Sequence, residues 1–223
     1  MSAEKPLAID LFCGLGGWAD GLIAEGWYVV GFDIEQHVYG DERYPARLVL
    51  QDVLTLHGRQ FKDARLIVAS PPCQAYSYRA MPWSRAKALP PPDNSLFEAC
   101  FRIQREASEA AGRHIPMVVE NVRGAQKWVG RSRWNYGSFH LWGDVPALMP
   151  IAKAVKVGGI DLNGYGTPGR KAPVGTSWFN DAARTPDSLA SMGGKSNARK
   201  AASAMIAKIP FPLASYIGSV FKP

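Results

Sequence analysis

The sequence of 223 residues is poor in cysteine and contains no long apolar run. Its cysteines stand at positions 13, 73 and 100. Three widely spaced thiols argue against a disulfide framework and are typical of reduced intracellular cysteines. No stretch approaches the length needed to cross a bilayer, and the opening MSAEKP lacks the charged and then apolar pattern of a signal peptide. We therefore expect a cytoplasmic protein without a membrane segment.

Metal-binding patterns are also missing. The four histidines, at positions 37, 57, 114 and 140, form no pair at ligand spacing, and no CxxC motif accompanies them. We therefore expect no bound metal. The composition, 47% hydrophobic and 20% charged, is typical of a globular chain rather than a disordered one. A chain of this length supports one substantial hydrophobic core with a small appended lobe.

The net charge of +7 is unevenly distributed along the chain. Residues 143–223 contain 10 Lys and Arg against 4 Asp and Glu, whereas residues 1–142 contain 16 against 15. A basic C-terminal third on a nearly neutral body indicates a polyanionic partner that is met mainly by that third. A solvated basic surface would produce the same composition, so the charge only supports this interpretation.

Hydrophobic runs and turn residues alternate through the first 142 residues. A helix is predicted over Trp18–Glu25 and a longer one from Ser95 to a stop at Gly112, where apolar residues recur at helical spacing. Strands are predicted over Pro6–Phe12, Trp27–Phe32, Arg47–Leu50, Leu66–Ala69, Met117–Val119 and Ser138–Trp142. This rhythm predicts an α/β fold, a mostly parallel sheet with helices on both faces.

The texture changes after residue 143. Residues 144–195 are rich in Gly, Pro, Asn and Ser and contain scattered aromatics, which predicts a small loop-rich lobe. Residues 198–209 are helical in character and stop at Pro210. We therefore divide the chain into a main domain over 1–143, a lobe over 144–195 and a C-terminal segment, 196–223, that returns to the main domain.

A glycine-rich turn, DLFCGLGGW over residues 10–18, follows the first predicted strand. Glycines at this place let the backbone pass close to a ligand, and ligands of parallel sheets bind at the carboxyl ends of strands. The spacing fails the nicotinamide-cofactor pattern, because Ala19 stands where a third glycine would be. Asp33 and Asp52 end the next two strands, and Asp33 is well placed for ribose hydroxyls. Together these residues predict a nucleoside pocket.

A cysteine in a stiff turn follows another predicted strand, in the sequence SPPCQ over residues 70–74. Two prolines fix the direction of the next side chain, so Cys73 is a candidate nucleophile. Most free cysteines are small buried hydrophobic residues, and Cys13 and Cys100, in or beside apolar stretches, fit that description.

An acid, Glu120, follows the strand Met117–Val119 in the sequence ENV. An acid at a strand end is often a helix cap or a surface charge. Here it is the third polar group delivered to one edge of one sheet, after Asp33 and Cys73. That convergence favours a functional site.

These motifs in this order, DLFCGLGGW, PPCQAYS and ENV, resemble the DNA cytosine-C5 methyltransferase family. The resemblance covers most of residues 6–142 and, more weakly, 196–218. It implies a Rossmann-like class I methyltransferase fold, with residues 144–195 as the target-recognition lobe. It also implies methyl transfer from S-adenosyl-L-methionine to C5 of a flipped-out cytosine in double-stranded DNA. Cys73 would be the covalent nucleophile and Glu120 its partner on the base.

The resemblance also implies binding residues and a setting. The setting would be a bacterial or phage-encoded monomer that acts on DNA inside the cell. The residues implied for the cofactor are Phe12, Gly14, Leu15, Gly16, Gly17, Trp18, Asp33, Ile34, Asp52, Val53 and Leu96. Those implied or placed by sequence on the substrate side are Pro72, Gln74, Ser77, Arg79, Arg85, Lys87, Asn121, Arg131 and Arg133.

The chain departs from the family pattern in its second half. The usual Gln-x-Arg-x-Arg run is missing, and Arg131-Ser-Arg133 stands several residues earlier than expected. The Gly-Asn-Ser-Val element near the C-terminus is missing too. One hypothesis is that Lys195, Arg199 or Lys200 accepts a donor with an extra acidic group. The short lobe predicts a short or relaxed DNA target.

Other functions remain open at this point. A cytosine methyltransferase acting on tRNA uses the same scaffold. A DNA-binding relative without catalysis is disfavoured by the intact Cys73, Gln74 and Glu120. A nicotinamide-dependent enzyme is disfavoured by the glycine spacing.

Overall fold

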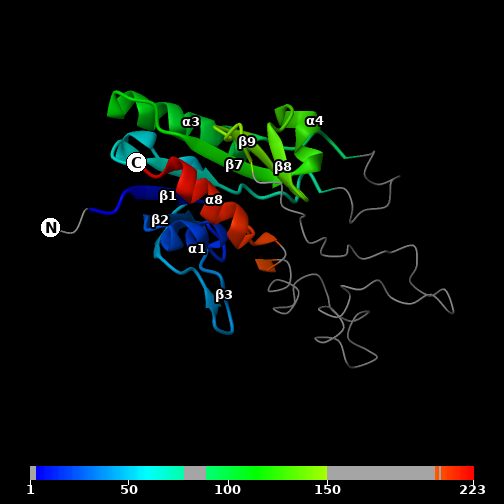
Figure 1. The fold of residues 1–223 in the computed structure, drawn as a ribbon. Coiled ribbons are helices and arrows are strands. Elements are labelled where there is room, and N and C mark those ends of the chain that lie inside the picture. Colours follow the sequence, from blue (N-terminus) through cyan, green and yellow to red (C-terminus); the bar gives the residue numbers. More distant parts are fainter. Residues whose placement is uncertain (1–3, 78–88, 150–203, 206) are drawn as a thin grey trace. The chain divides into compact units, whose positions relative to one another are not determined.

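The computed structural model describes residues 4–77, 89–149, 204–205 and 207–223 (Figure 1). The chain divides into two compact units, Met1–Ala152 with Lys208–Pro223, and Lys153–Ala207. Nearly all of the second unit lies outside the described residues. The predicted lobe over 144–195 and the boundaries 1–143 and 196–223 therefore stay predictions. The sheet and its helices belong to the first unit.

Within the described residues, seven strands form one sheet in the order β5-β2-β1-β6-β7-β9-β8. The first five strands in this order are parallel to one another, whereas β9 runs antiparallel to β7 and to β8. The strands are β1 (Leu7–Leu11), β2 (Tyr28–Asp33), β5 (Arg47–Leu50), β6 (Leu66–Ala69), β7 (Met117–Val122), β8 (Trp134–Tyr136) and β9 (Phe139–Gly143). The predicted mostly parallel sheet is confirmed.

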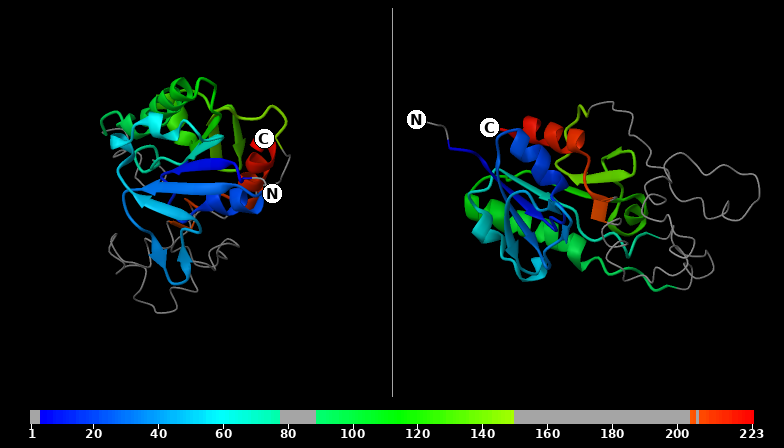
Figure 2. Two further views of the ribbon diagram at one scale, coloured as in Figure 1. Left: turned by 90° about the vertical axis from the view of Figure 1, so that its left-hand side faces the viewer. Right: turned by 90° about the horizontal axis from the view of Figure 1, so that it is seen from below.

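Helices cover both faces of the sheet, as predicted. In Figure 2, α3 lies on one face and α1 and α8 lie side by side on the other. The helices are α1 (Gly17–Ala24), α3 (Ser95–Ala111), α4 (Gln126–Val129) and α8 (Phe211–Phe221), with short 3-10 turns η1 (Val53–Thr55), η2 (Gly58–Phe61) and η4 (Arg123–Ala125). A small hairpin, β3 (Val38–Tyr39) and β4 (Glu42–Arg43), stands apart from the sheet.

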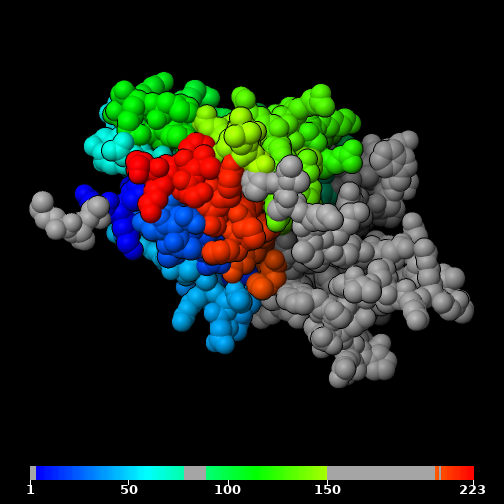
Figure 3. Space-filling model, in the orientation of Figure 1, coloured from blue at the N-terminus to red at the C-terminus, as the bar shows by residue number. Residues whose placement is uncertain are grey.

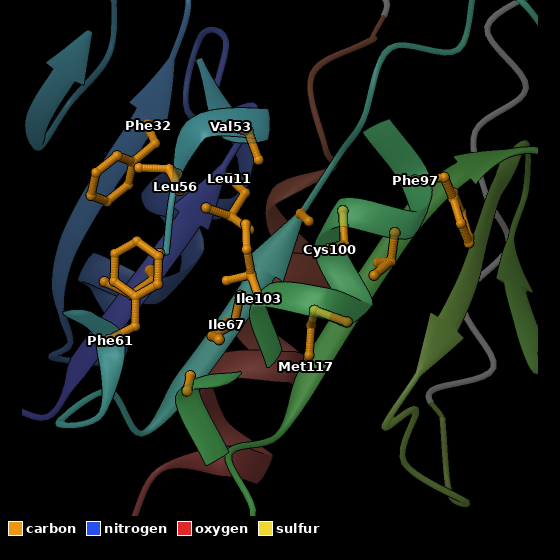
Figure 4. Packing of buried hydrophobic residues seen from close by; sticks show 14 of the residues in the cluster. Leu11, Phe32, Val53, Leu56, Phe61, Ile67, Phe97, Cys100, Ile103 and Met117 are labelled. Carbon is orange, nitrogen blue, oxygen red and sulfur yellow. The ribbon is translucent and has the colours of Figure 1, made fainter. Parts of the chain in front are cut away.

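The face under α3 is packed with apolar side chains (Figure 4). Side chains alternate along a strand, so Ile9 and Leu11 of β1 point to this face. Ile103 of α3 lies in the same cluster, and Phe97 of α3 packs edge-to-face against Trp142 of β9; both side chains of α3 are buried. Burial of each such side chain contributes about 1.5–3 kcal/mol. The helix begins where Asp93 Oδ1 accepts from the Ser95 amide (2.8 Å) and ends at a left-handed glycine, as predicted.

The opposite face is closed by a tight contact between α1 and α8. A Cβ added to Gly17 would lie 2.3 Å from the backbone nitrogen of Ile209, and one added to Gly21 would lie 2.4 Å from Ala214 Cβ. Only glycine permits this approach at these two positions. Trp27 Nε1 also donates to the Gly218 carbonyl (2.9 Å). Figure 3 shows the C-terminal helix (red) lying directly against the α1 segment (blue).

The sequence did not predict α8, because Pro210 indicated a stop. The helix starts at the next residue, Phe211, and has a proline in its first turn. A proline there removes only an amide that would have no helical partner. The strand β8 and the β3–β4 hairpin were also missed, because they contain two or three residues each.

Candidate functional site

The strand order reverses between β1 and β6, which lie side by side at the centre of the sheet. The chain leaves β1 for α1 on one face and leaves β6 for α3 on the other. The segments that follow these two strands therefore diverge, and in open α/β sheets ligands bind in the crevice between such segments. The glycine-rich turn follows β1 and the Pro-Pro-Cys turn follows β6, so both predicted motifs meet at this crevice.

The glycine-rich turn is held in a left-handed conformation. Phe12, Gly14 and Gly16 have φ angles of 57°, 49° and 77°, which is unusual for a phenylalanine. Gly14 donates its amide hydrogen to Asp33 Oδ2 (2.9 Å). A Cβ added to Gly14 would meet no atom within 4 Å, so this glycine faces open space.

The other glycines of the turn are covered by the protein itself. A Cβ added to Gly16 would lie 2.3 Å from Pro45 Cδ, and Gly17 packs on Ile209. Leu15 and Trp18 are buried as well, with 3% and 2% of their surface exposed. Leu15, Gly16, Gly17 and Trp18 are thus buried in the protein, whereas Phe12 and Gly14 are half-buried and lie nearer the surface.

Asp33 lies at the end of β2, beside the turn. Burial alone would raise the pKa of its carboxyl, but hydrogen bonds from His37 and from the amides of Gly14 and Glu35 outweigh burial and hold the pKa below its ordinary value. Asp33 is therefore ionised at neutral pH. A carboxylate has about four acceptor positions, so Asp33 retains capacity for a ligand hydroxyl.

Exposed apolar side chains follow the neighbouring strands β2 and β5. Ile34 is 73% exposed and Leu54 is 46% exposed, both unusually high for their type. Asp52 caps the turn that follows, because its Oδ1 accepts from the Leu54 amide (2.9 Å). Carboxylates beside exposed aliphatic surface suit a nucleoside, whose ribose needs acceptors and whose base needs apolar contact. Val53, in the same turn as Leu54, is buried, and Leu96, at the start of α3, is half-buried.

Asp10 is a buried acid that sequence reasoning quoted but gave no role. It lies in β1 with no exposed surface, on the face covered by α1, and accepts from the Tyr44 hydroxyl (3.3 Å). Among the described residues, its Oδ1 has no hydrogen-bond partner. Burial raises the pKa of Asp10 well above its ordinary value, so the carboxyl is protonated in the folded state. The tyrosine ring reaches it by crossing over Gly31, whose added Cβ would lie 2.3 Å from the ring.

Cys73 begins a one-turn loop after β6. Its carbonyl accepts from the amides of Tyr76 (2.9 Å) and Ser77 (3.0 Å), and Tyr76 anchors the loop in the core and donates to Asn94 Oδ1 (2.9 Å). Burial raises the pKa of the Cys73 thiol; a hydrogen bond with Ser77 opposes this, and Glu120 in its ionised form adds to it. The resting form is therefore the thiol, and the sulfur lies within electrostatic range of Glu120.

Glu120 lies in β7, next to the end of β6. The register pairs Ala69 with Val119, so the following residues, Ser70 and Glu120, are neighbours at the carboxyl edge. Glu120 is 8% exposed. Burial raises its pKa to about 8, against an opposing hydrogen bond from Ser70. The carboxyl is therefore protonated at neutral pH and can donate a hydrogen bond.

Asn121 is buried and fastens the Pro-Pro segment to β7. Its Nδ2 donates to the Pro71 carbonyl (2.8 Å) and its Oδ1 accepts from the Val122 amide (2.8 Å). Both ends of the amide are therefore engaged within the protein. Pro72 and Gln74 lie on the exposed side of the same turn.

The arginines of the Arg-Ser-Arg segment are exposed and stand at the start of β8. Strand β9 separates β8 from β7, and the Arg133 amide donates to Leu141 in β9 (2.8 Å). Arg133 lines a shallow depression with Asp144 and Val220. The structure thus does not bring Arg131 and Arg133 beside Cys73. Arg79, Arg85, Lys87, Lys195, Arg199 and Lys200 lie outside the described residues.

A hydrogen-bond network that contains a histidine lies beside Asn121. It was not predicted from the sequence, because an isolated histidine forms no motif. His140 of β9 pairs in register with Asn121, and its Nδ1 lies 2.9 Å from Ser132 Oγ. Ser132 in turn donates to Gln126 Oε1 (3.1 Å). Burial, with the nearby charge of Arg123, lowers the pKa of His140, so the ring is neutral at neutral pH.

Two classes of feature are missing from the described part of the chain. No helix there is long and apolar enough to cross a membrane. No group of three or more His, Cys, Asp or Glu side chains there is placed to hold a metal ion.

Comparison with known proteins gives one family and a set of solved structures. The family model of the C-5 cytosine-specific DNA methylases matches residues 7–129. Among curated proteins none matches. The S. pombe Dnmt2 methyltransferase is 17% identical, with a TM-score of 0.37 over 56% of this chain and 36% of its own. An E. coli prophage protein assigned as a DNA modification methyltransferase is 25% identical, with a TM-score of 0.39 over 56% and 34%. The matched region thus spans about a third of each of these two proteins.

Proposed function

The chain belongs to the C-5 cytosine-specific DNA methylase family, and from that premise we propose that it methylates C5 of cytosine in double-stranded DNA. The proposed donor is S-adenosyl-L-methionine. The observation that carries the proposal is the meeting of Cys73, Glu120 and the glycine-rich turn at the crevice between β1 and β6. The turn follows β1, Cys73 follows β6, and Glu120 lies within the adjacent strand β7, so their convergence is a property of the fold.

The described residues fit the donor. Gly14 faces open space, the Asp33 carboxylate retains acceptor capacity for a ribose, and exposed Ile34 and Leu54 offer apolar surface to an adenine. When bound, S-adenosyl-L-methionine supplies an electrophilic methyl group on a sulfonium. We propose that the remaining predicted cofactor residues hold the turn in shape, in keeping with the burial of Leu15, Gly16, Gly17, Trp18 and Val53.

Cys73 and Glu120 divide the chemistry on the base. The Cys73 thiolate adds to C6 while protonated Glu120 donates a hydrogen bond to N3, so the charge that develops on the ring is stabilised. C5 then has enamine character and would accept the methyl group that a bound donor supplies, with the C–S bond broken and the donor left as a neutral thioether. Loss of the C5 proton to a base and elimination of the thiolate regenerate the enzyme and release 5-methylcytosine.

The protonation states of these two groups support this division of roles. Burial keeps a proton on Glu120 up to a pKa of about 8, so it can act as a donor at neutral pH. A protonated Glu120 carries no charge to repel the thiolate. Cys73 is a thiol at rest, and Ser77 favours its ionised form through a hydrogen bond. The nucleophile is thus formed only in a small fraction of molecules until substrate arrives.

We propose that the target base leaves the duplex, because neither face of a stacked cytosine is open to a thiolate. The loop that starts at Cys73 and the basic C-terminal third are the proposed DNA contacts. Pro72 and Gln74 are exposed beside the nucleophile and are the proposed contacts to the flipped base. Residues 144–195 are the proposed target-recognition lobe, and Arg79, Arg85, Lys87, Arg131 and Arg133 are proposed phosphate contacts.

The test is covalent trapping on a duplex that contains 5-fluorocytosine. Fluorine at C5 cannot leave as a cation, so the adduct between Cys73 and C6 persists and is resolved by denaturing electrophoresis. We expect an adduct that requires S-adenosyl-L-methionine, is missing in Cys73→Ala and is retained in the matched control Cys100→Ala. Cys100 is fully buried in the core under α3, on the sheet face opposite to Glu120, so its thiol is not presented to a substrate.

Two outcomes would contradict the proposal. An adduct that survives in Cys73→Ala would remove the assigned nucleophile. An adduct formed with a tRNA that contains 5-fluorocytidine, and not with the duplex, would replace DNA with RNA as the substrate.

A further inference from the structure

Ser70 occupies a position between the glycine-rich turn and Glu120. It follows β6, the strand that lies between β1 and β7, and its amide donates to the Leu11 carbonyl at the end of β1 (3.1 Å). Ala69 pairs with Leu11 on one side and with Val119 on the other. One residue further, Ser70 therefore stands beside Glu120, on the sheet face covered by α1.

The hydroxyl of Ser70 has a fixed donor. Trp18 Nε1, at the start of α1, donates to Ser70 Oγ (3.0 Å). An indole nitrogen can only donate, so Ser70 accepts in this bond and its own hydrogen is free for another acceptor. Trp18 is 2% exposed and held by its packing, so the direction of this bond is set by the fold. The strand register places the Glu120 carboxyl beside this hydroxyl as the neighbouring acceptor, and hydrogen bonding by Ser70 acts to lower the pKa of Glu120.

Donation from Trp18 to Ser70, and from Ser70 to Glu120, makes the two carboxyl oxygens of Glu120 unequal. A protonated carboxyl has one oxygen that carries the hydrogen and one that mainly accepts. The oxygen that accepts from Ser70 is the carbonyl oxygen, so the hydrogen resides on the other one, which is turned away from Ser70. Without Ser70, the proton could reside on either oxygen, and only one of the two arrangements presents a donor to the base.

We propose that Ser70 is a positioning residue that, held by Trp18, fixes which oxygen of Glu120 carries the proton and directs that proton toward the cytosine ring. The inference rests on the proposed function, because it assigns a purpose to the orientation of Glu120. It also links the proposed cofactor turn to the proposed acid, since Trp18 belongs to that turn. A shift of the start of α1 would be transmitted through Trp18 and Ser70 to Glu120.

The test is Ser70→Ala with two readouts. Loss of one oriented hydrogen bond is expected to lower kcat by about tenfold, with KM for S-adenosyl-L-methionine within about twofold of wild type. The Ser70 hydroxyl favours the ionised form of Glu120, so its removal raises the pKa of Glu120 further. Carboxyl ¹³C NMR titration of the protein without substrate measures that rise. Ser70→Thr keeps the hydroxyl and is expected to restore both values.

Ser108→Ala is the matched control. Ser108 is also partly buried and engaged, because its hydroxyl accepts from the Ile115 amide (3.1 Å), but it lies in α3 on the opposite face. This variant is expected to keep the kcat and the Glu120 titration of wild type. Trp18→Phe, which removes the donor to Ser70, is expected to change both readouts in the same direction as Ser70→Ala, and it serves if Ser70→Ala fails to fold.

The outcomes separate this inference from the proposed function. A Ser70→Ala protein with wild-type kcat, or with reduced kcat and an unmoved Glu120 titration, overturns the inference while leaving the proposed function intact. A wild-type protein that forms no adduct with 5-fluorocytosine DNA removes the proposed function and, with it, the purpose assigned to Ser70.

Discussion

The two faces of the sheet differ in what they bury. Under α3 the contacts are apolar, from Phe97 and Ile103 to the alternate side chains of β1, β6 and β7. Under α1 and α8 the same strands place polar groups beneath the helices, with Asp10 in β1, Ser70 after β6 and Glu120 in β7. The face under α1 and α8 also buries apolar side chains, among them Leu66, Val68 and Val118, so the polar groups lie within a second apolar layer.

The burial of polar groups on one face lowers the stability of the fold and also sets the protonation state of Glu120. A buried acid without a full set of partners destabilises the fold, and one oxygen of Asp10 finds no partner in the described part of the chain. The same desolvation keeps Glu120 protonated at neutral pH, which the proposed chemistry requires. The apolar face supplies the stability that allows the polar face to retain these groups. Four substitutions test this division.

Ile103→Ala is expected to have the largest effect on stability. Ile103 has no exposed surface and lies at the centre of the α3 face (Figure 4), so truncation leaves a cavity and costs about 2–5 kcal/mol of unfolding free energy. Urea unfolding followed by circular dichroism measures the loss. Adduct formation per folded molecule should stay at the wild-type level. A selective loss of adduct in the folded variant would show that the α3 face is not merely structural.

Glu120→Gln is expected to act mainly on the reaction. Gln donates from an amide and cannot transfer a proton, so the methylation rate should fall by about 10²–10³-fold. In wild type, log(kcat/KM) should stop rising near pH 8, where Glu120 begins to lose its proton, although Cys73 continues to ionise. In the variant it should keep rising past pH 8. An unchanged break in the profile would assign it to another group.

The same substitution has a measurable effect on stability. Folded Glu120 keeps its proton to about pH 8, whereas the unfolded chain releases it near 4.5. Unfolding therefore releases a proton between these values, and the unfolding free energy of wild type falls as pH rises through this window. Glu120→Gln lacks this dependence, so its stability relative to wild type should increase from pH 5 to pH 8. Chemical unfolding at both values, with Ser108→Ala as control, measures the difference.

Gly31→Ala is expected to destabilise by about 1–3 kcal/mol, because the added methyl would overlap the Tyr44 ring. The cost should be much smaller in a Tyr44→Ala background, where the ring is gone. Chemical unfolding of the two single variants and the double variant gives the coupling. Additive effects would mean that the ring does not lie over Gly31.

Tyr44→Phe should have the smallest effect, about 0.5–1.5 kcal/mol, because it removes the hydroxyl that Asp10 accepts from and leaves the ring in place. Thermal unfolding at a fixed pH measures it. Asp10→Asn gives the comparison, since an amide fills the same volume without ionising. If Tyr44→Phe equals wild type, the hydrogen bond to Asp10 contributes nothing to stability.

Local pattern was sufficient for the main elements of the fold. Arg47–Leu50 and Leu66–Ala69 form strands with the predicted bounds, and the helix from Ser95 ends at Gly112 as predicted. The strand at Met117 continues three residues further than predicted, to Val122, because pairing with β9 extends it across Glu120 and Asn121. From the sequence alone, a polar residue after an apolar run indicates the end of a strand. In the structure, pairing with a neighbouring strand can keep such a residue within the strand.

The sequence by itself determined that a glycine-rich turn and a cysteine in a Pro-Pro turn each follow an apolar strand, and that an acid follows a third apolar run, because hydrophobic runs and turn chemistry are local properties. Only the tertiary structure decided that Tyr44 crosses Gly31 to reach Asp10 and that Trp18 donates to Ser70 beside Glu120. These contacts join residues that are far apart in the chain. Their formation depends on sheet register and on the close approach of helices, and neither is written in any single stretch of sequence.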